Sequence, residues 1–407
     1  MQNSHKTIAL ELFLILIIPL FATQFAAVNA QPKTVTVPND YSTIQDAVDH
    51  ANAGDTVFVK AGNYTLTGYP SGLTINKPIS LIGQGKEDTI LTQHLYKGSD
   101  TVIHVSADEV TISGFTIRGG MIDIEISGSN CKMTDNNIAN GYMNGLEISG
   151  TNNIVSENDF TNNAVFGIYV TASDSSISNN SLSGNGYAGI ILDSCKNVTI
   201  SQNKILGNGN QEYENSTGGL ILRWSGPFHV NGNIVSNNYG FGIQFGEGCN
   251  NAIVSNNNVI GNQFGFRLLN YIINPSGIAS LGSGNQVFWN NVENNNVSVF
   301  IEHSSNFIIN KEEGDIGSGT DIVSWDNGVV GNYWSDYSGY WSYVIDQNNA
   351  DNHPFTQPID ITKPAQTPAN SARGNSLTSL LFAVTAIVAL AIIVVTILLY
   401  KRHRKTT

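Results

Sequence analysis

Two glutamates in a repeating unit are the residues best suited to acid–base chemistry. Glu125 and Glu147 lie 22 residues apart, which is also the period of the surrounding repeat. If successive units stack at the strand spacing of about 4.8 Å, the two carboxylates approach the separation of about 5 Å found in retaining glycosidases. Two like charges at that distance should raise one of the two pKa values. The pair is therefore a candidate for polysaccharide hydrolase or lyase chemistry.

Further polar and aromatic side chains fall in the same part of the repeat and are suited to binding sugars. Aromatic planes stack on sugar rings, whereas carboxylate, amide and guanidinium groups bond to hydroxyls. The predicted ligand-binding residues are Glu125, Glu147, Tyr169, Asp193, Arg223, Trp224, Gln244 and Arg267. An insertion at Gln211–Thr217 would wall a groove beside them. The alternative is an ordinary solvated face, on which an Asp193–Arg223 ion pair is worth under about 1 kcal/mol.

The regular repeat, in which most of these residues lie, runs from Cys131 to about Asn262. Each unit has an Asn, an apolar residue two positions later, and a glycine that opens a short strand; most units also have a second Asn. The first Asn of successive units is Asn136, Asn158, Asn180, Asn203, Asn233 and Asn257, and the second is Asn163, Asn185, Asn208, Asn238 and Asn262. A fixed period in this range indicates stacked units that share one core.

Short alternating runs without helical spacing favour coils of about three strands. Asn fits the corners because it tolerates left-handed backbone and because stacked amides extend a hydrogen-bonded ladder. The predicted fold class is all-β, a single-stranded parallel β-helix of about eleven coils. Strand side chains alternate, so with Asp123 in the glycine column one outward column reads Glu125, Glu147, Tyr169, Ile191, Ile221, Gln244 and Arg267. The next outward column reads Ser127, Ser149, Thr171, Asp193, Arg223, Gly246 and Leu269.

Both ends of the chain carry segments outside this repeat. Residues 1–30 resemble a signal peptide, 31–72 form an N-terminal cap and first coil, and 73–310 form the repeats. Residues 311–360 close the rod, 361–376 form a linker, 377–400 are apolar enough for a transmembrane helix, and 401–407 are basic. This order predicts a single-pass protein of the cell membrane with an extracellular N-terminal ectodomain and a short cytoplasmic tail.

Ser42 and Gln45 predict the capping box of a short helix within Tyr41–Ala53.

The composition of the chain limits the binding partners and metal ions that can be expected. A net charge of −13 argues against nucleic-acid binding. Eight His and four Met are scattered without the clusters that copper sites use, so neither a metal nor a cofactor is expected. The three cysteines, Cys131, Cys195 and Cys249, are predicted to be buried small residues without a disulfide. Glycosylation candidates are the sequons at Asn63, Asn179, Asn197, Asn215 and Asn296.

Two stretches resemble known families. VTVPNDYSTIQDAVDHANAGDTVFVKAGNYT is similar to the N-terminal cap of pectate-lyase-like right-handed β-helix proteins. WDNGVVGNYWSDYSG and the following YVIDQNNADNHPF resemble the C-terminal signature of NosD-like proteins, which are described as copper-binding or as carbohydrate-binding and sugar-hydrolase repeat proteins. The resemblance covers roughly residues 34–358 and implies a right-handed helix. The Asp/Gly-rich loop of some relatives is missing, which implies that any calcium site there is lost.

The aromatic residues of this signature have two interpretations. They cap the C-terminal end of the core, or they form a sugar-stacking platform; they are Trp325, Tyr333, Trp334, Tyr337, Tyr340, Trp341 and Tyr343. Asp336, Asp346 and Asp351 are expected to form turns. The best functional hypothesis is a non-enzymatic protein that recognises an extracellular glycan or an envelope protein. The alternatives are a polysaccharide hydrolase or lyase, and a NosD-like copper-cluster assembly factor.

Overall fold

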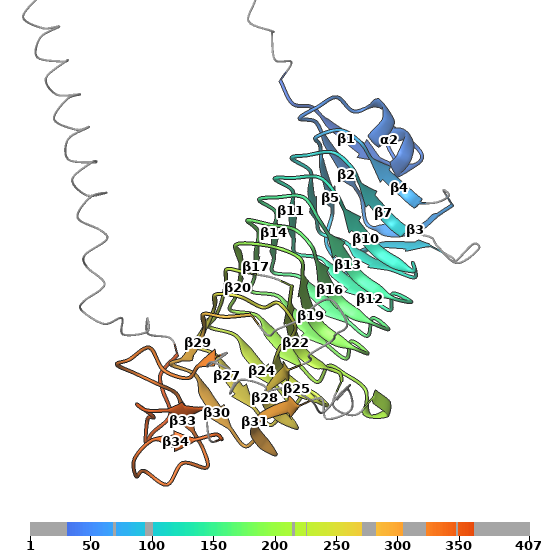
Figure 1. Cartoon of the computed structure of the whole chain (residues 1–407). Coiled ribbons are helices and arrows are strands. Elements are labelled where there is room, and N and C mark those ends of the chain that lie inside the picture. Colours follow the sequence, from blue (N-terminus) through green and yellow to red (C-terminus); the bar gives the residue numbers. More distant parts are fainter. Residues whose placement is uncertain are drawn as a thin grey trace, which may run out of the picture.

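Three parallel β-sheets run along a rod of stacked coils (Figure 1). The computed structural model describes residues 31–67, 71–93, 101–213, 216–224, 226–270, 282–303, 323–346 and 349–361. Within these residues the first sheet has 12 strands, the second 11 and the third 10. Strands of neighbouring coils pair in parallel, as Leu146 with Ile168 and Ile168 with Ile190. The predicted parallel β-helix of about eleven coils is confirmed.

The strands are short because each spans only one side of a coil. The first sheet comprises β1 (Thr34–Val37), β2 (Thr56–Val59), β5 (Ser80–Gly83), β8 (Thr111–Ser113), β11 (Lys132–Thr134), β14 (Ile154–Ser156), β17 (Ser176–Ser178), β20 (Val198–Ser201), β23 (Phe228–Asn231), β26 (Ala252–Ser255), β29 (Asn285–Phe288) and β32 (Val323–Ser324). The second comprises β3 (Gly62–Leu66), β6 (Thr89–Gln93), β9 (Thr116–Arg118), β12 (Asn137–Ala139), β15 (Asp159–Thr161), β18 (Ser181–Ser183), β21 (Lys204–Leu206), β24 (Ile234–Ser236), β27 (Asn258–Ile260), β30 (Asn291–Glu293) and β33 (Tyr333–Trp334). The third comprises β4 (Ser71–Ile75), β7 (Thr101–Val105), β10 (Ile122–Ile126), β13 (Asn144–Ile148), β16 (Phe166–Val170), β19 (Ala188–Asp193), β22 (Gly218–Arg223), β25 (Phe241–Phe245), β28 (Phe264–Asn270) and β31 (Val297–His303).

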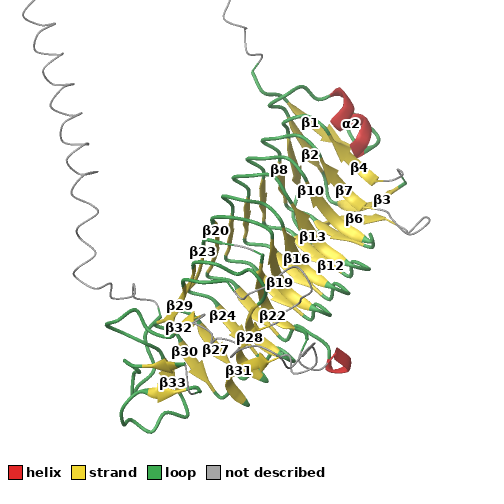
Figure 2. Ribbon diagram, viewed as in Figure 1, coloured by secondary structure: helices red, strands yellow, loops and turns green. Residues whose placement is uncertain are grey.

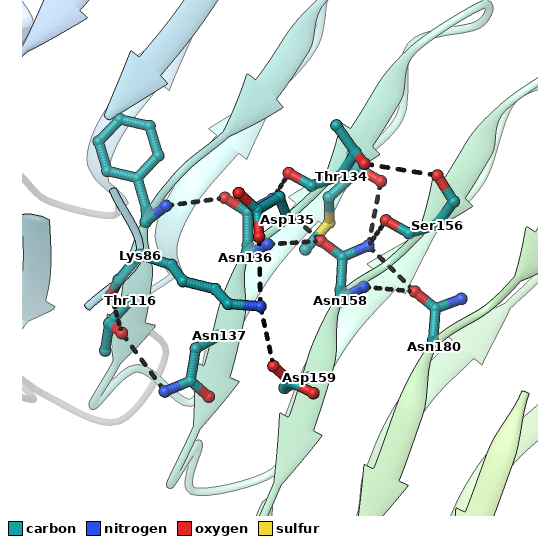
Figure 3. A network of polar contacts seen from close by, with 12 residues as sticks. Lys86, Thr116, Thr134, Asp135, Asn136, Asn137, Ser156, Asn158, Asp159 and Asn180 are labelled. Atoms are coloured by element: carbon teal, nitrogen blue, oxygen red, sulfur yellow. Dashed lines mark hydrogen bonds and ion pairs between the residues drawn. The ribbon is translucent and has the colours of Figure 1, made fainter. Parts of the chain in front are cut away.

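Buried asparagines form the predicted amide ladder between coils. The Asn136 Nδ2 and backbone N both donate to Asn158 Oδ1 at 3.0 Å, and Asn158 donates in the same way to Asn180 (Figure 3). The pattern continues through Asn203, Asn233, Asn257, Asn290 and Asn332. A second ladder runs through Asn163, Asn185, Asn208, Asn238, Asn262 and Asn295.

The left-handed backbone of the corners does not fall on the ladder residues. It falls on the residue before each ladder residue except Asn332, for example Glu157 with φ of 61° before Asn158 and Asn179 with φ of 56° before Asn180. This division of roles leaves the ladder side chain free to point inward while its neighbour makes the bend. The core between the sheets is filled by stacked Val, Ile, Leu and Phe side chains.

A short helix covers the N-terminal end of the rod, as predicted. Helix α2 (Ile44–His50) is the red helix labelled in Figure 2. Its N-cap is Thr43, whose side chain accepts from the Asp46 backbone N, so the predicted Ser42–Gln45 box is wrong by one residue. Gln45 instead bonds both backbone groups of Thr74 on β4, at 2.9 and 3.2 Å. These two bonds occupy the edge of the third sheet.

The C-terminal segment closes the other end of the rod. Trp325 and Trp334 are buried, and Tyr343 stacks on Trp334 with ring centroids 4.4 Å apart. The hairpin of β34 (Tyr343–Val344) and β35 (Ala350–Asp351) lies beyond them. Tyr340 and Trp341 are 76 % and 93 % exposed, so these two aromatic residues do not belong to the cap of the core.

The acidic residues of this segment have different roles from one another. Asp346 forms a turn as expected, because its carboxylate accepts from the backbone N of Asn349. Asp351 is fully buried instead, and its Oδ2 accepts from the backbone N of Asn332 and from Trp334 Nε1. Burial raises the pKa of Asp351, while these bonds oppose the shift. The expectation that Asp351 is only a turn former is therefore incomplete.

The predicted transmembrane helix requires a correction to the fold class. Among the residues that the structure describes, no helix is long and apolar enough to cross a membrane. The seven residues of α2 span about 10 Å, far less than a bilayer core of about 30 Å. The fold class is therefore an all-β parallel β-helix with a short capping helix, and the single-pass membrane localisation is not supported. Residues 1–30 and 377–400, on which the signal-peptide and transmembrane predictions fell, lie outside the described residues.

Candidate functional site

The outer face of the third sheet presents the predicted column of side chains. Strand pairing aligns Glu125 with Glu147 and Glu147 with Tyr169. Further along, it aligns Tyr169 with Ile191, Ile191 with Ile221, Ile221 with Gln244 and Gln244 with Arg267. The structure extends the column to His104 and Thr74 at its N-terminal end and to Phe300 at its C-terminal end. The alignment is confirmed, whereas the ligand-binding role of these residues stays a prediction.

The N-terminal part of the face brings together three titratable groups. His104 Nδ1 lies 2.9 Å from Glu125 Oε2, and both side chains are partly exposed. Glu147 accepts a 2.7 Å hydrogen bond from Asn144 Nδ2. Burial raises the pKa of Glu147, the bond from Asn144 lowers it, and the nearby Glu125 carboxylate raises it further, with a net increase. Glu147 therefore keeps its proton to a higher pH than an ordinary glutamate, as a general acid must.

The middle of the face is apolar, and neighbouring side chains cover it. It is therefore not an ordinary solvated surface. Ile191 and Ile221 point outward but are buried together with Phe241. Partly buried aromatic residues pack against this cluster, namely Phe166, Tyr169, Tyr187 and Phe300. The cluster divides the carboxylate end of the face from the guanidinium end.

The C-terminal part of the face holds a cavity of about 170 Å³. Its lining includes Ile221, Gln244, Arg223, Arg267, Glu247 and Tyr187. Ser216 of the insertion also lines it, as the groove hypothesis requires. The insertion begins with the 3₁₀ turn η1 (Gln211–Tyr213), and residues 214–215 lie outside the described part of the chain.

Both guanidinium groups of this cavity are held by carboxylates. Arg223 Nε and Nη2 bond Asp193 Oδ2 at 3.0 and 2.8 Å, and Tyr169 Oη bonds the same oxygen at 3.2 Å. Arg267 bonds Glu302 and donates to Gln244 Oε1 at 2.8 Å. The Arg267 side chain is only 7 % exposed. These contacts fix the donors before any ligand arrives, which lowers the entropy lost on binding.

Trp224 does not line this cavity. It follows β22 with φ of 48°, and its indole lies against Gly248. The ring is 48 % exposed. It therefore lies at the corner of its coil, beside the face rather than on it.

Asp123 occupies the glycine column of the third sheet and is fully buried. Its Oδ1 accepts from the backbone N of Gly120 at 3.0 Å, whereas Oδ2 has no hydrogen-bond partner. Burial raises the pKa of Asp123 well above its ordinary value. A methyl group placed on Gly141 would lie 3.0 Å from Asp123 Oδ2 and 3.1 Å from Asn163 Oδ1, so both oxygens border one small space. Asp123 thus lies beside Asn163, the first residue of the second ladder.

The remaining sequence-predicted residues are placed as follows. The sequon residues Asn63, Asn179, Asn197 and Asn296 are exposed, and Asn215 lies outside the described residues; no observation tests their glycosylation. Cys131, Cys195 and Cys249 are buried and form no disulfide, as expected. In the described ranges no group of three or more His, Cys, Asp or Glu residues is placed to hold a metal ion.

The geometry of coils, ladders and three sheets defines a class of protein, the parallel β-helix proteins. A family model described as "right handed beta helix region" matches residues 101–259 and 177–311, and the chain belongs to this family. The predicted pectate-lyase-like, right-handed helix is therefore shown. The finer resemblance to NosD-like proteins stays a prediction.

Solved structures with the same fold include polysaccharide-modifying enzymes. The mannuronan C-5 epimerase AlgE6 A-module of Azotobacter vinelandii is 18 % identical with a TM-score of 0.53, covering 63 % of this chain and 73 % of its own. Pectate lyase Pel9A is 17 % identical with a TM-score of 0.51, covering 74 % of this chain and 81 % of its own. The alginate lyase of Paenibacillus sp. str. FPU-7 is 15 % identical with a TM-score of 0.53, covering 67 % of this chain and 98 % of its own. At such identities the likeness shows the fold alone. A comparison with curated proteins found no match.

Proposed function

We propose that this β-helix binds an extended glycan along the outer face of its third sheet, without cleaving it. The observation that carries the proposal is the cavity beside Gln244, where Arg223 and Arg267 are held in place by carboxylates. The three similar structures, which are a mannuronan C-5 epimerase, a pectate lyase and an alginate lyase, add support because they share this scaffold.

The chemistry of the cavity suits a sugar better than an apolar ligand. Guanidinium and amide N–H groups donate to hydroxyl and carboxylate oxygens, and Glu247 can accept from hydroxyls. Tyr187 supplies an aromatic edge beside the buried Ile221. A chain of sugars seated there would continue over Tyr169 toward Glu147, because all these residues stand in one column or next to it.

Binding to polysaccharides tests this proposal. The probes are alginate, pectate and a panel of neutral polysaccharides, applied to the purified chain. Gln244→Ala is expected to weaken binding about tenfold, because it removes a hydrogen-bonding amide and the partner of Arg267. His229→Ala is the matched control, since His229 is exposed on β23 of the first sheet. The proposal fails if no polysaccharide binds, or if His229→Ala weakens binding equally.

A second candidate, a polysaccharide hydrolase or lyase, is favoured by the row of His104, Glu125 and Glu147. The raised pKa of Glu147 suits a proton donor, and His104 holds the neighbouring carboxylate. Product analysis by mass spectrometry on every polysaccharide that binds tests it. If oligosaccharides are released, Glu147→Gln should lower the rate by at least about a hundredfold, since acid–base catalysis contributes about 10² to 10⁴. Binding without product, from the unchanged protein, rejects this candidate.

A further inference from the structure

The closing segment and the last coils enclose a second cavity of about 510 Å³. Its lining comes from the start of β29, from β32 with the turn after it, and from the β34–β35 hairpin. The volume lies within the range of about 300 to 1,000 Å³ that is typical of small-ligand sites. The polar residues of the lining include Gln286, Ser324, Asp326, Asp346, Asn349 and Asn352.

The polar groups around this cavity are held in place by one another. Asp346 Oδ1 accepts from both the backbone N and Nδ2 of Asn349, at 2.8 and 3.0 Å. Asn349 Oδ1 in turn accepts from the buried Trp325 Nε1 at 3.3 Å. Asp326 accepts from the backbone N of Gly328 at 2.8 Å and from that of Asn352 at 2.9 Å. A site whose groups are fixed in this way loses little side-chain entropy when a ligand binds.

The charges select the class of ligand. Asp326 and Asp346 both line the cavity, and among the described lining residues there is no Lys or Arg. An acidic ligand would therefore meet two carboxylates and no Lys or Arg in the lining; His353, whose Nδ1 lies 3.3 Å from Asp326 Oδ2, does not line the cavity. Although burial raises the pKa of Asp326, the bonds from Asn352, Gly328 and His353 bring it below its ordinary value, so this carboxylate stays ionised.

A bare metal ion fits the same groups poorly. The carboxylate oxygens already accept N–H groups, whose hydrogens would face the cation. Hydroxyl groups are a better match, because each bonded carboxylate oxygen can still accept an O–H and each amide can both donate and accept. The apolar side chains of Val323, Val344 and Ala350 offer surface for the faces of a sugar ring.

We propose that this cavity binds one unit of a neutral sugar. The site lies apart from the face of the third sheet and does not depend on the function proposed for that face. It gives a role to the two C-terminal sequence stretches, from which Trp325, Asp326, Asp346, Asn349 and Asn352 all come. Closing the rod alone would require the apolar and aromatic residues of these stretches, but not a polar cavity of this volume.

Saturation-transfer NMR with the purified full-length chain tests the proposal. The probes are glucose, galactose, mannose and N-acetylglucosamine, with galacturonate as the acidic comparison. At least one neutral sugar should give a signal from the unchanged protein. Ala350→Phe, which places a ring in the cavity, should abolish it, and Gln286→Ala should weaken the affinity about tenfold. Gln286→Ala keeps the test informative if the larger substitution prevents folding.

The matched control is His229→Ala, at an exposed position on β23 of the first sheet, which should leave the signal of the neutral sugar unchanged. Gln244→Ala measures any share of the signal that comes from the face of the third sheet, so a failure of the face and a failure of this cavity give different results. The proposal is overturned if none of the four neutral sugars gives a signal, since the cavity then holds only water. It is equally overturned if Ala350→Phe binds as well as the unchanged protein, or if galacturonate binds more tightly through Gln286.

Discussion

Replacement of Asn158 by alanine is expected to lower the free energy of unfolding by about 3 kcal/mol. The Asn158 side chain accepts from Asn136 and donates to the carbonyl oxygen of Met133, and all three residues are buried. Without it, the backbone N of Asn136 and that carbonyl lose their partners away from water. Each buried polar group left unpaired costs about 1 to 3 kcal/mol.

Urea-induced unfolding, followed by circular dichroism, measures this change. Ser156→Ala is the control, because Ser156 lies two residues away in the same coil and its side-chain hydroxyl makes only a long 3.5 Å contact with the Thr134 hydroxyl (Figure 3). We expect the control to change the free energy of unfolding by less than about 0.5 kcal/mol. Equal effects of the two substitutions would show that the ladder does not stabilise the coils.

Replacement of Asp123 by asparagine is expected to stabilise the protein by about 1 to 3 kcal/mol at pH 8. Asp123 Oδ2 borders the same space as Asn163 Oδ1 and has no partner, and an amide nitrogen in its place can donate to that oxygen. The substitution would extend the second ladder by one coil. It also removes the cost of a carboxyl that must either ionise in the core or carry a proton.

The pH dependence separates this effect from a general gain in packing. Burial raises the pKa of Asp123 in the folded protein, whereas in the unfolded chain this carboxyl has its ordinary pKa of 3.8. Between these two pKa values the folded protein therefore keeps a proton that the unfolded chain releases. The stability that depends on this group is therefore complete below the unfolded pKa and is lost as pH rises toward the folded pKa. Asp123→Asn should gain more over the unchanged protein at pH 8 than at pH 4. Asp108→Asn, at an exposed position, should show no such difference, and an equal gain at both pH values would contradict the assignment.

The repeat made the coils and the outward columns predictable from the sequence. A regular period and one glycine per unit suffice to align Glu147 with Tyr169 and Gln244 with Arg267, because strand residues alternate between the two faces. His104 was missed because it lies one coil before the repeat becomes regular. Its spacing of 21 residues from Glu125 was nevertheless a signal that could have found it.

The covering of the face could not be predicted in the same way. Ile191 and Ile221 point outward and were expected to meet solvent, yet they are buried against aromatic residues of other columns and corners. Tyr187 lies just before its strand, so the alternation of strand residues does not assign it to a column on either side of the sheet. Whether an outward residue is covered depends on insertions and corners, which do not follow the period of the repeat.

The direction of the first ladder has a consequence for growth at the end of the rod. From Asn136 to Asn332 every amide donates toward the C-terminal end, so each coil offers N–H groups to the next. The last recipient is the Asp351 carboxylate, which can accept these groups but, when ionised, has no hydrogen to pass on. The series of amide hydrogen bonds therefore ends at Asp351. Because Asp351 is fully buried, the first ladder ends inside the molecule and presents neither a donor nor an acceptor to a second rod, which discourages end-to-end stacking of rods into fibres.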